Sequence, residues 1–165
     1  MSIIRGRVWK YGDNVNTDVI YPGKYLYSIV DHKEMAEHAL EGLDPSFIRE
    51  VKPNDIIVAG KNWGCGSSRE AAVVCLKESG VGAIIAKSFA RIYYRNCLNS
   101  ALPAFICPDA VDEIQQGDEA SIDVDAGEIR VNDKTFRFPP FPDEVKEILE
   151  VGGLVAYVRK SREGG

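Results

Sequence analysis

Three short, continuously apolar segments, separated by helix-like segments, constrain the fold of this chain more than any other feature. They lie at residues 55–60, 82–86 and 104–107. None of them alternates polar with apolar residues, so each is expected to be a strand buried on both faces. Helices are predicted from Ser67 to about Glu78 and, with Ser88 as the capping residue, to about Leu98. The β-α-β-α-β order predicts an α/β domain with a parallel core.

The segments that flank this core predict a second sheet layer and further helices. Residues 119–124 and 128–131 alternate around a short turn, which is typical of a hairpin. The other expected elements are strands over 3–8, 135–138 and 154–158, a short extended piece over 19–23, and helices over 32–40 and 143–150. We therefore expect one compact domain over residues 1–165, with a β-meander layer added to the βαβ core.

Composition and charge argue against several classes of protein. With 165 residues, 45% of them hydrophobic, the chain can bury roughly 70% of the surface that its unfolded form exposes. A net charge of -5 is unlike that of a nucleic-acid-binding domain. No apolar run approaches the ~20 residues that a membrane-spanning helix needs, and the first residues do not resemble a signal peptide. We expect a cytoplasmic protein that binds neither nucleic acid nor membrane.

The pattern of cysteines and histidines does not predict a metal site. Four cysteines occur, at positions 65, 75, 97 and 107, and no two have the spacing of zinc ribbons or common iron–sulfur sites. The last three lie among apolar residues and are expected in the core, whereas Cys65 lies in a glycine turn where its thiol is expected to be reactive. His32 and His38 are six residues apart on a predicted helix and do not share a face. We expect this chain to bind no metal or cofactor itself.

A turn between the first apolar strand and its helix carries the strongest functional signal, Gly64-Cys65-Gly66-Ser67-Ser68-Arg69-Glu70. The predicted helix places Ser67 and Ser68 at or beside its N-terminus, where backbone N–H groups favour negative charge. Arg69 adds a guanidinium that can hold a carboxylate through two hydrogen bonds. Gly64 and Gly66 are expected to allow a turn that a Cβ would block. The turn suits a small carboxylic acid, although a capping serine beside a surface arginine is the simpler alternative.

Three blocks of sequence give a resemblance to a known family. Residues 60–70, together with 16–26 and 88–103, resemble the signature of the small subunits of 3-isopropylmalate dehydratase. Those subunits correspond to the swivelling C-terminal domain of the aconitase family, and the family order and spacing extend here from about residue 3 to residue 158. The resemblance implies a three-layer β/β/α fold. It also implies a hydro-lyase of leucine biosynthesis, which interconverts 2-isopropylmalate and 3-isopropylmalate through 2-isopropylmaleate by dehydration and rehydration.

The resemblance also implies how the work is divided between two polypeptides. A [4Fe-4S] cluster on a separate large subunit would bind the substrate hydroxyl and a carboxylate. On this chain, Ser67 matches the catalytic serine, a base that removes a proton from the carbon next to a carboxylate. Ser68 and Arg69 match residues that hold a carboxylate of the 2-hydroxy dicarboxylate substrate, and Asp18 matches an acidic residue beside the serine. The expected partner is the large subunit, and the face that docks with it can drive self-association when that subunit is missing.

In this family, substrate specificity is expected in the segment after a Pro-Gly turn, here Lys24-Tyr25-Leu26-Tyr27-Ser28. Family members that act on tricarboxylates present an arginine there, and this segment has none. Burial of an isopropyl group contributes about 2 kcal/mol, whereas an unpaired third carboxylate in a closed site costs more. Isopropylmalate is therefore the expected substrate. Lys24 leaves open homoaconitase, dual or citraconate-type specificity. A stand-alone dicarboxylate-binding module and a purely structural subunit are the alternatives from other classes.

Overall fold

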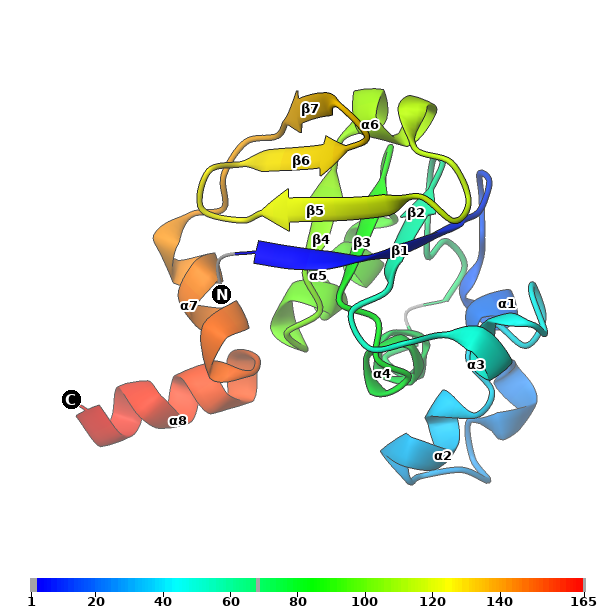
Figure 1. The fold of residues 1–165 in the computed structure, drawn as a ribbon. Helices are drawn as coiled ribbons and strands as arrows, with labels where there is room; N and C mark the ends of the chain where they lie inside the picture. The colour runs from blue at the N-terminus through cyan, green and yellow to red at the C-terminus, as the bar shows by residue number, and fades with distance from the viewer. Residues whose placement is uncertain (1–2, 68, 165) are drawn as a thin grey trace.

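A single mixed sheet forms the centre of the molecule (Figure 1). The computed structural model describes residues 3–67 and 69–164. The sheet has seven strands in the order β4-β3-β2-β1-β5-β6-β7. Their bounds are β1 Ile3–Lys10, β2 Ile56–Ala59, β3 Ala83–Ala86, β4 Ala104–Ile106, β5 Glu119–Asp123, β6 Glu128–Val131 and β7 Lys134–Arg137. Strand β1 pairs parallel with β2 and antiparallel with β5, so it joins a parallel half to an antiparallel meander.

Three layers are stacked because both faces of the parallel strands are apolar. Successive side chains of a strand point to opposite faces. Ile56 and Val58 face the meander and share a core cluster with Ile122 of β5. Ile57, between them in the sequence, faces the helices and shares a second cluster with Leu76 of α4 (Ala71–Glu78). In Figure 1 the meander lies over the parallel strands on one side, with α4 and α5 (Arg91–Asn99) on the other. The predicted β/β/α architecture and its parallel βαβ core are confirmed.

The helices surround the parallel half and the C-terminal end. Helix α4 links β2 to β3 and α5 links β3 to β4, as the apolar pattern predicts. The prediction of Ser88 as the capping residue is wrong, because Ala90 is the N-cap of α5 and the Ser88 hydroxyl accepts a hydrogen bond from the Asn62 N–H instead. The helical elements are α1 Thr17–Ile20, the 3-10 turn η1 Gly23–Tyr25, α2 His32–Ala36, α3 Phe47–Glu50, α4 Ala71–Glu78, α5 Arg91–Asn99, α6 Pro108–Glu113, α7 Asp143–Val151 and α8 Leu154–Gly164. Within residues 3–67 and 69–164, none of these helices is both long and apolar enough to cross a membrane.

The prediction of a last strand over residues 154–158 is wrong, because this segment begins helix α8. A short apolar run does not by itself distinguish a strand from a helix. Leu154, Tyr157 and Val158 also have the i, i+3, i+4 spacing of one helical face, and α8 contacts α7 and α5. Leu154 and Val158 remain 38% and 39% exposed, so the contacts with α7 and α5 bury only part of this face.

Predictions for the N-terminal segment are also partly wrong. The piece over 19–23 is only partly extended, since α1 covers Thr17–Ile20 with Asn16 as its N-cap and extended backbone begins at Tyr21. The Asn16 side chain accepts hydrogen bonds from two backbone N–H groups of the first turn. Asp31 does cap α2, as predicted, but the helix ends at Ala36 rather than near residue 40. The turns that follow place Leu40 at a positive φ of 56° while burying its side chain completely.

Candidate active site

The site forms where the loops that follow β1 and β2 meet. Adjacent parallel strands present their carboxyl ends at one edge of the sheet, which is where α/β proteins gather functional loops. Here the two loops are joined by backbone hydrogen bonds. The Gly64 N–H donates to the Val15 carbonyl and the Thr17 N–H donates to the Cys65 carbonyl, both at 2.8 Å. Asn16 and Cys65 thereby form an isolated parallel bridge, which holds the start of α1 against the glycine turn.

Both glycines of the turn are required by its geometry, as the sequence predicts. Gly64 has φ +83°, and a Cβ on it would lie 2.2 Å from Cγ of the buried Tyr93 ring. Gly66 has φ +103°, and a Cβ there would lie 3.3 Å from Oγ1 of Thr17. Only glycine adopts such φ values without strain. The turn can therefore approach α5 and α1 closely enough to bring Ser67 to the start of α1.

Replacing Gly64 by alanine is expected to destabilise the fold by roughly 2–5 kcal/mol, the sum of a positive-φ penalty and overpacking against Tyr93. Urea unfolding of the isolated chain measures this change. Gly117→Ala is the matched control, because Gly117 also has a positive φ, of 86°, but no atom within 4 Å of its added Cβ. That control should lose only about 1–2 kcal/mol. Equal losses in the two variants would show that Tyr93 does not restrict this turn.

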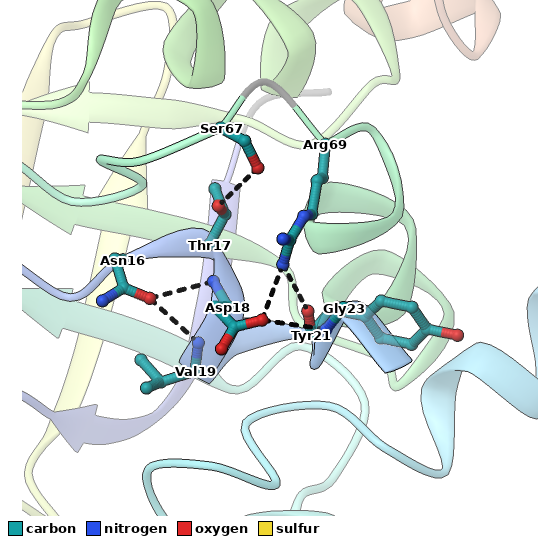
Figure 2. A network of polar contacts seen from close by, with 8 residues as sticks. All are labelled: Asn16, Thr17, Asp18, Val19, Tyr21, Gly23, Ser67 and Arg69. Carbon is teal, nitrogen blue, oxygen red and sulfur yellow. Dashed lines mark hydrogen bonds and ion pairs between the residues drawn. The ribbon is translucent and has the colours of Figure 1, made fainter. Parts of the chain in front are cut away.

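Ser67 lies outside the helix at whose N-terminus the sequence places it. Helix α4 begins at Ala71, with Glu70 as its N-cap. Ahead of the helix, the Arg69 N–H donates to the Ser67 carbonyl at 3.0 Å. The side chain of Ser67 is exposed, and its Oγ lies 3.4 Å from Oγ1 of the buried Thr17 (Figure 2). The Ser67 hydroxyl therefore does not lie in the first turn of α4, where the helix dipole acts most strongly. Ser68 lies outside the described residues.

Arg69 and Asp18 form an ion pair across the two loops. Nη1 of Arg69 donates to Oδ1 of Asp18 at 2.9 Å, and the same nitrogen lies 3.5 Å from the Tyr21 carbonyl oxygen. The Gly23 N–H donates to the same carboxylate oxygen at 2.9 Å. The Arg69 hydrogen bond, followed by that from Gly23, lowers the pKa of the Asp18 carboxyl group. Asp18 is thus an anion at neutral pH and orients the guanidinium rather than leaving it free.

Two residues that sequence reasoning did not single out complete this network. Thr17 places a buried hydroxyl beside Ser67. Gly23 lies close against the ion pair, because a Cβ on it would lie 3.0 Å from Nη2 of Arg69 and 3.2 Å from Oδ1 of Asp18. Both residues belong to the block 16–26, so the resemblance contains the signal, but their roles depend on contacts with the turn about fifty residues later. Figure 2 shows Ser67 and Arg69 extending from one loop toward Thr17 and Asp18 on the other.

The segment 24–28 begins beside this network and divides into exposed and packed residues. Lys24, Tyr27 and Ser28 are exposed, with Tyr27 97% accessible. Tyr25 and Leu26 are half-buried and pack against the core that the helices share. The segment is not a plain loop, because its first residues form the 3-10 turn η1. Its exposed residues are available to a bound molecule or a partner chain.

The cysteines are arranged as the sequence predicts. Cys75, Cys97 and Cys107 are buried, and burial raises the pKa of each thiol. Cys65 is half-buried in the glycine turn. Within residues 3–67 and 69–164, no three His, Cys, Asp or Glu side chains come together as a metal site.

Known proteins resemble this chain over almost its whole length. Residues 13–106 match the aconitase C-terminal domain family. A 3-isopropylmalate dehydratase small subunit from Caldanaerobacter subterraneus is 52% identical over 159 residues, covering 95% of this chain and 98% of that protein. A methanogen homoaconitase small subunit from Methanothermobacter thermautotrophicus is 51% identical over 166 residues, covering 99% and 95%.

The solved structures agree. The crystal structure of a 3-isopropylmalate dehydratase from Methanocaldococcus jannaschii matches with a TM-score of 0.91 and 48% identity, covering 97% of this chain and 95% of that one. Similarity of this strength in both sequence and fold identifies the family. This chain therefore belongs to the aconitase C-terminal domain family, among the small subunits of 3-isopropylmalate dehydratase and their relatives.

Proposed function

We propose that Ser67, Arg69 and Asp18 form the small-subunit half of the active site of a 3-isopropylmalate dehydratase. The reaction interconverts 2-isopropylmalate and 3-isopropylmalate through 2-isopropylmaleate, by loss and return of water. The observation that carries the proposal is the Asp18–Arg69 ion pair, at 2.9 Å, on the same pair of loops as the exposed Ser67 hydroxyl. This arrangement supplies a fixed cation for a substrate carboxylate next to a group that can exchange a proton.

Ser67 is proposed to remove the proton from the carbon next to a carboxylate and to return it. A serine hydroxyl is a poor base at neutral pH, so the alkoxide needs stabilisation by fixed positive charge or hydrogen-bond donors. Arg69 is the nearby cation that this chain offers, and the Thr17 hydroxyl, 3.4 Å from Ser67, is a further donor. Because Ser67 is exposed in the isolated chain, we propose that the large subunit covers it and excludes water when the two assemble.

The [4Fe-4S] cluster that the family implies does not fit this chain. Such clusters are held mainly by cysteine thiolates, and the described part of the chain does not gather such a ligand set. Three of the four cysteines are also buried in separate core positions. We therefore propose that the cluster belongs to the large subunit. This chain, proposed to be one domain and located in the cytoplasm, contributes the serine and the carboxylate clamp.

Isopropylmalate is the proposed substrate because the exposed residues of the segment 24–28 include no arginine and present the ring of Tyr27. Homoaconitase activity is the second candidate. One observation favours it, namely the 51% identity to a methanogen homoaconitase small subunit over 99% of this chain. Lys24, at the start of the segment, is the cation that such a substrate would use.

Reconstitution tests the proposed function directly. The chain is mixed with its cognate large subunit under anaerobic conditions, and hydration of 2-isopropylmaleate is followed by the loss of its ultraviolet absorbance. We expect no turnover by either subunit alone and turnover by the mixture, with isopropylmalate preferred over homoaconitate. Turnover by the isolated small chain would contradict the split active site. A preference for homoaconitate would establish the second candidate instead.

A further inference from the structure

Two residues outside the segment 24–28 hold one of its side chains in place. The Tyr25 hydroxyl donates to Oε1 of Glu41 at 3.2 Å, and Nδ1 of His38 lies 3.3 Å from the same oxygen. The Tyr25 and His38 rings stack with their centroids 4.0 Å apart and an angle of 27° between their planes. Glu41 and His38 lie in the turns that follow α2. Together the three side chains form a cluster that links these turns to η1.

Lys24 lies beside this cluster, at the edge of a recess that begins at the active-site network. Its Nζ is 5.1 Å from the centroid of the Tyr25 ring. Lys24 and Glu41 both line a recess of about 430 Å³, together with Asp18 and Gly23, the residues that orient Arg69. The recess is thus continuous with the proposed carboxylate clamp. It carries one cation and two carboxylates, of which Asp18 is already paired with Arg69.

Glu41 is anionic at neutral pH. Partial burial raises the pKa of its carboxyl group, but the hydrogen bonds from Tyr25 and His38 and the nearby charges of His38 and Lys24 outweigh this effect and lower the pKa. The negative charge of Glu41 and the positive charge of Lys24 therefore line the same recess. The charge of Lys24 contributes to the lowered pKa of the Glu41 carboxyl group, so the two opposite charges interact and each offsets part of the other's field.

We propose that Glu41 is a specificity-determining residue, which offsets the charge of Lys24 and anchors Tyr25 so that the recess offers no net cation to a third carboxylate. His38 and Tyr25 are positioning residues that hold Glu41 toward the recess. Repulsion of the competing substrate by a placed like charge is a general route to specificity. The inference rests on the proposed function. It goes beyond that function by explaining how a segment that contains Lys24 would still reject a tricarboxylate.

The test replaces Glu41 by glutamine in the reconstituted complex. Glutamine keeps a carbonyl that can accept the Tyr25 hydrogen bond but removes the charge. We expect homoaconitate to bind roughly 5- to 10-fold more tightly, measured as a competitive inhibition constant. The reason is that loss of the Glu41 charge leaves the positive charge of Lys24 without its opposite. KM and kcat for 2-isopropylmalate should change by less than about 2-fold, since this substrate lacks the third carboxylate that would lie beside Lys24. An unchanged inhibition constant would overturn the proposal.

Lys24→Gln, made both alone and in the Glu41→Gln background, completes a double-mutant cycle. The gain in homoaconitate binding should disappear, and a gain that survives would show that Lys24 is not its cause. Glu37→Gln is the matched control, since Glu37 is an exposed glutamate just after α2 and lines no part of the recess described above. It should leave both substrates unaffected. A wild-type complex without isopropylmalate turnover would contradict the proposed function, whereas unchanged discrimination in an active complex would contradict only the role of Glu41.

Discussion

Replacing Ser67 by alanine is expected to lower kcat of the reconstituted complex at least ~10³-fold, with KM for 2-isopropylmalate changed less than about 3-fold. Removal of a positioned proton-transfer group affects the transition state, in which the proton moves, more than the ground state. Substrate binding should persist, because Arg69 and the network around Asp18 do not depend on the Ser67 hydroxyl. Steady-state kinetics on 2-isopropylmalate, with each variant assembled at a saturating concentration of large subunit, measures the change.

The Ser67→Ala substitution is expected to leave the fold of the chain unchanged. The Ser67 side chain is exposed, and the polar contact described for it is the 3.4 Å approach to Thr17. The isolated variant should therefore unfold at the same urea concentration as the wild type. Ser161→Ala, which changes an exposed serine of α8, is the matched control and should keep full activity. A Ser67→Ala complex that retained more than about a tenth of the wild-type kcat would remove this serine from the proton transfer.

Replacing Arg69 by alanine is expected to raise KM for 2-isopropylmalate roughly 10²-fold and to lower kcat as well. Hydrogen bonds to charged groups contribute about 1.5–3 kcal/mol each, and a guanidinium can make two to one carboxylate. Arg69→Lys keeps the charge but not the planar fork, so it should recover only part of the loss. Recovery of KM by lysine should be incomplete because Asp18 and Gly23 lie close to the guanidinium group itself. A Cβ on Gly23 would lie 3.0 Å from Nη2 of Arg69.

A surface arginine provides the control for this prediction. Arg130 lies on β6 of the meander and pairs with Glu128 at 3.1 Å, as Arg69 pairs with Asp18. Arg130→Ala removes an ion pair of similar length on a different layer and should leave both kinetic constants unchanged. If Arg69→Ala changed kcat without changing KM, the guanidinium would act on the reacting atoms alone, and the carboxylate clamp would be wrong.

The fold was predictable where hydrophobic pattern and burial agree. The continuous apolar strands β2 and β3 are buried on both faces, and the meander alternates, so the three-layer plan follows from period and length. Residues 154–158 were not predictable in the same way. Their side chains suit either a strand or a helix, and the outcome depends on whether a helix pair or a sheet edge is available for packing.

The site was predictable as a set of residue types but not as a geometry. The turn from Gly64 to Glu70 contains the serine, the arginine and the two glycines. Its sequence also predicted a helix starting at Ser67, and here local propensity was misleading. The contacts between Gly64 and Val15, and between Cys65 and Thr17, tie the turn to the loop after β1, and helix α4 begins only at Ala71. These contacts join residues about fifty positions apart, so no window of sequence contains them.

The sequence by itself determined the layer order of the parallel core, the buried cysteines and the residue types of the site, because these depend on local period, hydrophobicity and chemistry. Tertiary structure alone decided that Ser67 lies before the helix rather than in it, that Thr17 approaches its hydroxyl, and that Asp18 and Gly23 orient Arg69. It also placed Glu41 against Tyr25. The contact of Glu41 depends on how the turns after α2 pack against η1. For the other arrangements the physical reason is the same: they are set by where two loops meet at one edge of the sheet, and that meeting exists only once the strands have paired.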